Sequence, residues 1–363
     1  MTSFFESARS FYIQYERYLS AGALLTGFIV DNLTLKRIDF LFENAVMFSY
    51  LLIAGGGILL IQYGQKVLPP RQRFQKISVF FPLLVQFSFG ALFSAYFVFY
   101  SRSGSLTGTL FFLAILLTLL IGNEFFRTQY KKLVFQISIF FAALFSFLIF
   151  FIPVFMDAMS MAVFLLSGAV SILLITLLVY GLFKIIPARV IEEKEALFKS
   201  IGGIFIFINV LYFANIIPPV PLSLKDIGAY HKIEKKEGGG YFVYKEKSSL
   251  KIFEVWNTTI HRAPDERIYV YSSVFAPTDL NVDIFHRWQY FNEADGKWIT
   301  ANNIPFPITG GREEGYRGYS LKENVFPGKW RVDVTTTRGQ IIGRINFTVI
   351  STEQTPILFV EEK

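Results

Sequence analysis

The sequence predicts a membrane all-α bundle of six to seven transmembrane helices followed by an all-β, immunoglobulin-like sandwich domain. Hydrophobic residues make up 53% of the 363 residues and include 42 Phe. Nearly all the long apolar runs lie before residue 217, whereas 223–363 has the composition of an ordinary soluble domain. Such a break in composition indicates a domain boundary. We therefore expect a transmembrane domain at 1–217, a Pro-rich juxtamembrane linker at 218–240 and an extracytoplasmic β-sandwich domain at 241–363.

The transmembrane helices are predicted from the length of the apolar runs. A helix needs about 20 apolar residues to cross roughly 30 Å of hydrocarbon. The segment Leu19–Leu35 contains Asp31 near its end, so it either spans the bilayer or lies at its interface. The other runs are Ala45–Tyr63, Ile77–Tyr100, Leu106–Ile121, Leu133–Phe155, Met161–Phe183 and Ile201–Ile217.

The distribution of Lys and Arg predicts the orientation of these helices. The loops 64–76, 122–132 and 184–200 carry eleven Lys and Arg residues, and the alternate loops carry three. Basic loops stay on the cytoplasmic side of a membrane. We therefore expect a multi-pass protein of the cytoplasmic (inner) membrane, with its N-terminus in the cytoplasm and its C-terminal domain outside.

Polar residues in the membrane half suggest one candidate site. The deep amides of Gln86, Gln136 and Asn209 are interpreted as interhelical hydrogen-bonding groups. A group of polar residues is expected at the outer rim of the bundle, where it either caps helices and pairs its own charges or forms a polar site. Its members are Asp31, Arg37, Asp39, Glu43 and Asn44.

The C-terminal half is expected to form short antiparallel strands. In Lys329–Val334, Trp330, Val332 and Val334 alternate with charged residues, the pattern of a half-buried strand. The chain has no Cys, so the disulfide of antibody domains is excluded. The expected strands are Tyr241–Lys245, Lys251–Trp256, Arg267–Phe275, Val282–Phe291, Lys297–Thr300, Tyr316–Leu321, Trp330–Thr336 and Ile341–Ile350.

The Gly-rich loop at 310–319 is the candidate binding loop. Its two arginines suit anionic groups and its tyrosines suit stacking, although the glycines also fit a plain hairpin. No helix follows it, so a phosphate loop is not predicted. The candidate residues are Arg312, Glu313, Tyr316, Arg317 and Tyr319.

The three histidines predict no metal site. His286 lies on an otherwise apolar strand face and is interpreted as a hydrogen-bonded core residue, while His231 and His261 lie in unrelated segments. No pair of them has metal-ligand spacing. We expect no metal, no cofactor and no catalytic residues.

Three segments together resemble a known family. They are Ile216–Lys225 with Pro218 and Pro219, the strand segment His286–Trp288, and Gly328–Val334 with Trp330. This combination resembles bacterial membrane proteins that carry the domain of unknown function 2914. The resemblance implies a bacterial envelope protein in which these motif positions have a structural role, and it implies no activity or cofactor.

These observations favour a non-enzymatic protein in the lipid bilayer whose outer β domain binds an envelope polysaccharide or a membrane or envelope protein. The alternatives are a channel or transporter for a lipid or small solute, and a membrane-embedded enzyme acting on lipid-linked substrates. Nucleic acid is not expected as a partner, because the cations cluster in short loops between apolar runs rather than on one face.

Overall fold

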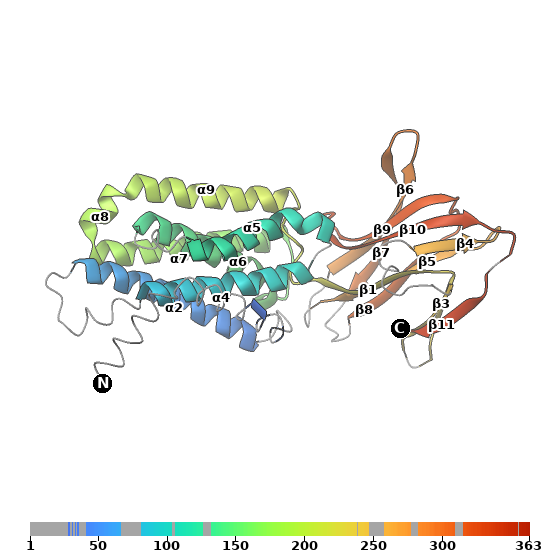
Figure 1. The fold of residues 1–363 in the computed structure, drawn as a ribbon, viewed down its shortest axis with the longest axis horizontal. Helices are drawn as coiled ribbons and strands as arrows, with labels where there is room; N and C mark the ends of the chain where they lie inside the picture. Colours follow the sequence, from blue (N-terminus) through green and yellow to red (C-terminus); the bar gives the residue numbers. More distant parts are fainter. Residues whose placement is uncertain are drawn as a thin grey trace. The chain divides into compact units, whose positions relative to one another are not determined.

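The computed structural model describes residues 28, 29, 31, 33, 35, 41–66, 81–103, 106–125, 132–237, 239–246, 258–276, 282–308, 315–354 and 356–363. The chain divides into a helical unit, which ends at Ala214, and a second unit, which contains the strands that follow (Figure 1). The second unit also contains the short segments Arg102–Thr109 and Asp157–Met159.

Seven helices occupy the described part of the helical unit. Five of them are long and apolar enough to cross a membrane, and α5 contains a shorter apolar stretch, Leu110–Gly122. Most of the predicted Leu19–Leu35 segment lies outside the described residues. The helices are α2 (Leu41–Lys66), α4 (Phe81–Arg102), α5 (Leu106–Phe125), α6 (Leu133–Phe155), α7 (Met161–Ile185), α8 (Pro187–Glu192) and α9 (Lys194–Phe213).

The last long helix is displaced from the run that the sequence predicts. Helix α9 begins at Lys194 and ends at Phe213, whereas the apolar run extends from Ile201 to Ile217. Asn215 has a φ of 56°. This left-handed conformation cannot continue a helix, and Asn tolerates it better than most residues. The helix therefore ends before the prolines are reached.

Hydrogen bonds tie α6 to its neighbours inside the helical unit. The Gln62 amide on α2 donates to Gln136 Oε1 on α6 at 2.8 Å, and both side chains are fully buried. The hydroxyl of Tyr96 on α4 donates to the Ala143 carbonyl at 2.9 Å. The predicted interhelical bond of Gln136 is thus confirmed. The prediction is wrong for Asn209, whose amide donates to the Phe205 carbonyl of its own helix.

The second unit contains three described sheets. One has the order β1-β5-β8, a larger one the order β4-β10-β9-β6-β7, and a small one the order β11-β3-β2. The strands are β1 (Ser223–Tyr230), β2 (Lys232–Lys235), β3 (Tyr241–Glu246), β4 (Thr258–Arg262), β5 (Ile268–Phe275), β6 (Val282–Asn292), β7 (Lys297–Ile308), β8 (Tyr316–Lys322), β9 (Gly328–Thr336), β10 (Ile341–Ser351) and β11 (Leu358–Glu362).

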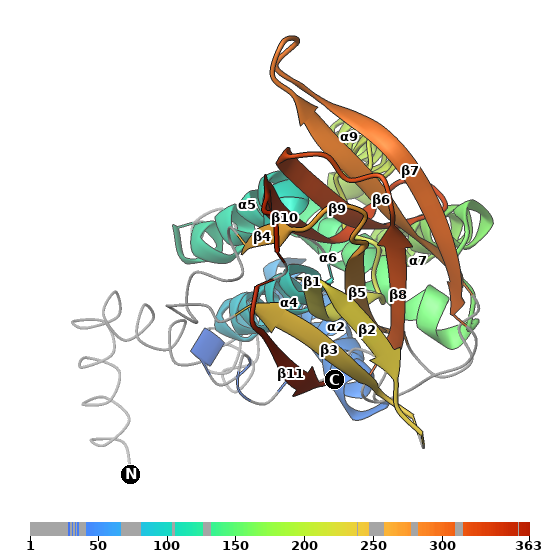
Figure 2. The same ribbon diagram turned by 90° about the vertical axis from the view of Figure 1, so that its right-hand side faces the viewer.

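These strands agree with most of the predicted ones. The expected strand Lys251–Trp256 lies outside the described residues. Strands β1 and β2 fall within 218–240, where a linker is expected, and the predicted strand that starts at Lys297 extends to Ile308 in β7. The hairpin of β6 and β7 projects beyond the neighbouring strands (Figure 2).

The first two sheets share one hydrophobic core. Ile268 and Val270 of β5 pack in the same cluster as Trp288 of β6 and Trp330 of β9, and all four are almost completely buried. The two tryptophans predicted as structural positions are therefore core residues. Each side chain is anchored, because Trp288 Nε1 donates to Ser320 Oγ and Trp330 Nε1 to the Phe326 carbonyl.

His286 is a buried core residue, as the sequence predicts. Its Nε2 lies 2.7 Å from Ser272 Oγ and its Nδ1 lies 2.8 Å from Ser320 Oγ. A neutral imidazole suits two hydroxyl partners, because a hydroxyl both donates and accepts. Burial lowers the pKa of His286 to about 3.

Acid is therefore expected to destabilise this unit through His286. The pKa is lower in the folded state than in the unfolded chain, so the stabilisation is present above about pH 6.5 and is lost as the pH falls towards 3. Between pH 6.5 and pH 4 the expected loss is about 3 kcal/mol. Unfolding of the full chain, followed by near-ultraviolet circular dichroism between pH 7 and 4, measures it. The His286→Asn variant should show a shallower loss of stability on acidification, and an identical slope would contradict this account.

Candidate binding face of the five-stranded sheet

One face of the five-stranded sheet packs on the core and the opposite face carries polar and charged residues. Successive side chains of a strand point to opposite faces. On β9, Trp330, Val332 and Val334 are buried in the two core clusters of this unit. Lys329 and Arg331 therefore belong to the other face, which we call the arginine face, as does Asp333 between Val332 and Val334.

A completely buried carboxylate lies at the centre of the arginine face. Asp333 on β9 is the cross-strand neighbour of Arg287 on β6 and of Arg344 on β10. Arg344 donates from Nε to Asp333 Oδ1 at 2.5 Å and from Nη2 to Oδ2 at 2.9 Å. Arg287 Nη2 donates to the same Oδ2 at 3.2 Å. Asp333 is 0% exposed, so these two guanidinium groups shield it from solvent.

A third guanidinium is fixed in the adjacent row of the sheet. Arg331 Nε donates to Gln289 Oε1 at 2.8 Å, and the Gln289 amide donates to Thr300 Oγ1 at 3.2 Å. The Arg331 guanidinium carbon lies 4.3 Å from the centre of the Trp298 ring. Stacking on an aromatic face together with a fixed hydrogen bond holds an arginine in one orientation.

Aromatic and cationic side chains continue along the same face. Phe291 and Trp298 are opposite one another on β6 and β7, with their ring centres 5.3 Å apart. Lys329 Nζ lies 5.6 Å from the centre of the Phe291 ring. Four cations (Arg287, Lys329, Arg331 and Arg344) share this face with two carboxylates, the buried Asp333 and the exposed Asp283 at an earlier position of β6, so its formal charge is +4 − 2 = +2.

The crowding of cations affects the pKa of Arg331. Burial and the nearby Arg344 guanidinium lower the pKa of Arg331, Asp333 opposes that change, and Arg287 adds to it. The face thus holds more positive charge than its own carboxylates neutralise. Surfaces of this kind attract anions, because the uncompensated charge is retained in a partly desolvated site.

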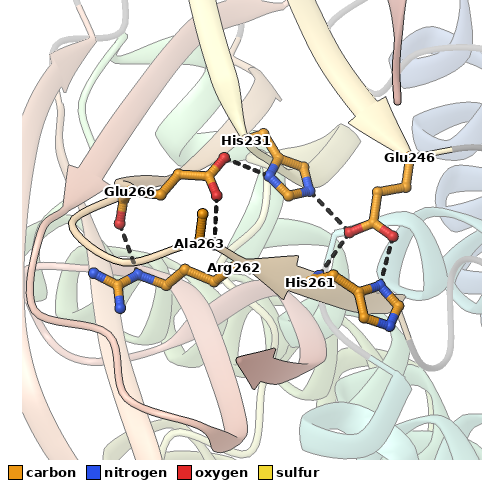
Figure 3. Close-up of polar contacts among 6 residues, drawn as sticks. All are labelled: His231, Glu246, His261, Arg262, Ala263 and Glu266. Carbon is orange, nitrogen blue, oxygen red and sulfur yellow. Dashed lines mark hydrogen bonds and ion pairs between the residues drawn. The ribbon is translucent and has the colours of Figure 1, made fainter. Parts of the chain in front are cut away.

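The β unit contains a second polar cluster, built around His231 (Figure 3). His231 joins β1 to β2, and its side chain is 2% exposed. Its Nδ1 lies 2.7 Å from Glu266 Oε1 and its Nε2 lies 2.9 Å from Glu246 Oε1. An imidazole donates to two carboxylates only when both nitrogens carry a proton, so this arrangement suits the imidazolium form.

The carboxylates of this cluster are also bound by backbone groups. Glu246 accepts from the backbone N–H of His261 at 2.6 Å, and its Oε2 lies 2.7 Å from His261 Nδ1. Glu266 accepts from the Ala263 N–H at 2.9 Å. Burial would raise the pKa of Glu246, but the bonds from His261 and His231 outweigh it and hold that pKa below its usual value. The cluster therefore fastens the end of β3 to β4 and to the turn before β5.

Neither arrangement is a metal centre. In the part of the chain that the structure describes, no group of three or more His, Cys, Asp or Glu side chains is placed to hold a metal ion. Around His231, each carboxylate oxygen that faces an imidazole nitrogen is hydrogen-bonded to it, which is the geometry of ion pairs.

The candidate loop is described only in part. Arg312 and Glu313 lie outside the described residues. Tyr316 packs against the core, whereas Tyr319 is 38% exposed and lies beside Tyr241 and Tyr269. Arg317 is opposite Ser273 on β5, and Tyr241 Oη donates to the Arg317 carbonyl at 3.4 Å. Tyr316, Arg317 and Tyr319 thus belong to β8, in the sheet formed by β1, β5 and β8.

The predicted rim cluster is also only partly described, since Arg37 and Asp39 lie outside the described residues. Glu43 and Asn44 are buried in the first turn of α2, and Glu43 Oε2 has no hydrogen-bond partner among the described residues. The Asp31 side chain lies beside Ser94 of α4. Pro218 and Pro219 follow helix α9 in the chain and are buried in tight turns.

Comparison with known proteins adds one finding. Residues 281–349 match the family model described as a protein of unknown function (DUF2914). This match confirms the resemblance drawn from the His286–Trp288 and Gly328–Val334 motifs. It contains every residue of the arginine face named above, and it begins at residue 281, after the last residue of the His231 cluster.

Two further comparisons are uninformative about function. None of the curated proteins matches the chain. Among solved structures, the Pseudomonas fluorescens alkylpurine DNA glycosylase AlkC bound to DNA containing an abasic site analog aligns with 10% identity over 87% of this chain and 100% of its own. The TM-score of 0.23 is too low to indicate a shared fold.

Loss of the Asp333 charge is expected to destabilise the β unit. The Asp333→Asn variant leaves Arg287 and Arg344 without their carboxylate, which should cost about 2–4 kcal/mol of unfolding free energy. Denaturant unfolding of the full chain measures this change. Asp283→Asn, at an exposed position of β6, is the matched control and should change stability by less than about 0.5 kcal/mol. Equal losses in both variants would contradict the central role of Asp333.

Removal of His231 should also be costly. In the His231→Leu variant two carboxylates, Glu246 and Glu266, lose a common buried partner, so a loss of about 2–4 kcal/mol is expected. His261→Leu is the control, because the His261 side chain is 44% exposed and contacts only one of the carboxylates. Thermal unfolding distinguishes the two, and a larger effect at His261 would refute the proposed fastening role of His231.

Proposed function

We propose that this protein is a non-enzymatic integral membrane protein that binds an acidic polymer of the bacterial cell envelope through the arginine face of its β domain. The helical unit anchors the chain in the cytoplasmic membrane, and the β domain, an immunoglobulin-like sandwich, lies on the outer side. The observation that carries the proposal is the surplus of two positive charges on a sheet face that also presents aromatic rings.

The chemistry of the arginine face favours binding over catalysis. Guanidinium groups form paired hydrogen bonds with carboxylates and phosphates, and aromatic rings next to them offer flat surfaces for stacking. Asp283 is exposed on this face, whereas the buried carboxylate, Asp333, already accepts three hydrogen bonds from arginines. It is therefore engaged in orienting cations, and the face offers anion recognition rather than general acid–base chemistry.

The exposed surface of the helical unit supports its proposed role as the membrane anchor. Its five long apolar helices expose large hydrophobic side chains, for example Ile206 at 64% and Phe155 at 76%. Contact with lipid is the ordinary reason for such exposure on a long apolar helix. The excess of Lys and Arg in 64–76, 122–132 and 184–200 supports a cytoplasmic position for these segments.

The predicted orientation is tested with single cysteines, because the chain has none of its own. We expect a membrane-impermeant maleimide added to intact cells to label Asn302→Cys, at an exposed position of β7, and not Ala196→Cys near the start of α9. Both variants should react after the membrane is permeabilised. Labelling of Ala196→Cys in intact cells, with Asn302→Cys protected, would overturn the proposed location.

The binding function is tested with the purified full chain in detergent. Carboxymethyl dextran and phosphorylated dextran serve as acidic probes, and neutral dextran is the control probe. The double variant Lys329→Gln/Arg331→Gln should bind the acidic probes at least about tenfold more weakly, because two of the phosphate- or carboxylate-binding cations are lost. The matched control is Lys232→Gln/Lys235→Gln on β2, which should bind normally. Equal affinity for neutral and acidic dextran would contradict the proposal.

A further inference from the structure

Three guanidinium groups of the arginine face retain most of their hydrogen-bonding capacity. Each guanidinium offers five N–H donors. Arg287, Arg331 and Arg344 together make four side-chain hydrogen bonds within the described part of the chain, three to Asp333 and one to Gln289. Arg287 Nε is buried, and no described residue accepts a hydrogen bond from it.

The charge of this arginine cluster is also only partly balanced. Three guanidinium groups and the Asp333 carboxylate sum to 3 − 1 = +2. A carboxylate ligand supplies one negative charge, whereas a phosphate monoester supplies about 1.5 to 2 and brings three acceptor oxygens. Since Arg287, Arg331 and Arg344 come from three neighbouring strands, β6, β9 and β10, a tetrahedral oxyanion suits them better than a planar one.

The cluster is held in place before any ligand arrives. Asp333 fixes Arg344 by two hydrogen bonds and Arg287 by one, while Gln289 and the Trp298 ring fix Arg331. Preorganised donors lose less side-chain entropy on binding. Lys329 lies two residues from Arg331 on the same face, about 7 Å along β9. Its ammonium group can therefore bind a second acidic group of the same ligand.

On the basis of the proposed function, we propose that Arg287, Arg331 and Arg344 form a binding site for a phosphate ester, with Asp333 as the residue that positions two of them. Trp298 and Gln289 hold the third arginine. The ligand is thereby assigned to the phosphate-bearing class of envelope polymers or headgroups rather than to polymers whose acidic groups are carboxylates.

The decisive experiment compares phosphorylated and carboxymethyl dextran of equal charge density on the full chain in detergent. We expect the phosphorylated polymer to bind at least about tenfold more tightly. The Arg331→Lys variant keeps the charge but loses the planar guanidinium, so it should reduce the preference for phosphate to about twofold. The near-ultraviolet circular dichroism of this variant should match that of the parent protein, because Arg331 lies on the surface.

The possible results separate this inference from the proposed function. Equal binding of both polymers, with Arg331→Lys behaving as the parent protein, overturns the phosphate assignment and leaves acidic-polymer binding intact. Binding of neither polymer overturns both. Phosphate preference that survives Arg331→Lys but disappears in Arg317→Gln overturns the location, because it places the site on β8.

A competition experiment identifies the source of the phosphate. Glycerol phosphate and a soluble short-chain phosphatidic acid are added to the complex with phosphorylated dextran. Displacement by both compounds at similar concentrations indicates that the phosphate group itself is recognised, which supports the site. Displacement by the phosphatidic acid alone indicates that the site binds the phosphate headgroup of a lipid rather than a phosphate-bearing polymer. Failure of both to compete at any concentration overturns the assignment of a phosphate site.

Discussion

The buried carboxylate of Asp333 organises the side of the β domain to which we assign function. A carboxylate that is 0% exposed is stable only if its charge is compensated and its lone pairs are occupied. Arg287 and Arg344 meet this requirement from the two strands that flank β9. The same ion pairs that stabilise Asp333 therefore bring guanidinium groups together, and Arg331 in the next row makes their charge exceed what one carboxylate can neutralise. The ion pairs of Asp333 thus account both for the stability of this face and for its capacity to bind anions.

The core beneath this face explains why the cations stay at the surface of a rigid sheet. Trp288 and Trp330 occupy the buried side of β6 and β9, and each donates its indole N–H to a neighbouring acceptor. Because strands alternate, every buried side chain fixes its neighbours on the opposite face. A one-residue slip of β9 would move Arg331 and Asp333 into the hydrophobic core. The apolar residues thus set the register, and the register aligns Asp333 with its two arginines.

The sequence allowed the division into two units and most strands to be predicted, because long apolar runs and period-two alternation are local patterns. The alternation in Lys329–Val334 even placed Arg331 and Asp333 on the face opposite Trp330. The partners of Asp333 were not predictable in this way. Arg287 and Arg344 are separated from it by 46 and 11 residues, and only the pairing of β6, β9 and β10 brings them together.

Other differences have equally specific causes. Strand β1 follows three prolines closely, and such a segment predicts a linker rather than a strand. The His231 cluster depends on contacts between residues that are 15 and 35 positions apart. The loop at 310–319 is a candidate from the sequence because its glycines, arginines and tyrosines are adjacent. The arginine face cannot be predicted in this way, because its members are scattered over four strands.

The most direct measurement of the central claim is an experimental structure of the full chain with phosphorylated dextran bound. Our account predicts density for a phosphate group at roughly 3 Å from the Nη atoms of Arg331, with Arg287 and Arg344 still bonded to Asp333. Density for the ligand at another surface, with the arginine face unchanged and unoccupied, would contradict it.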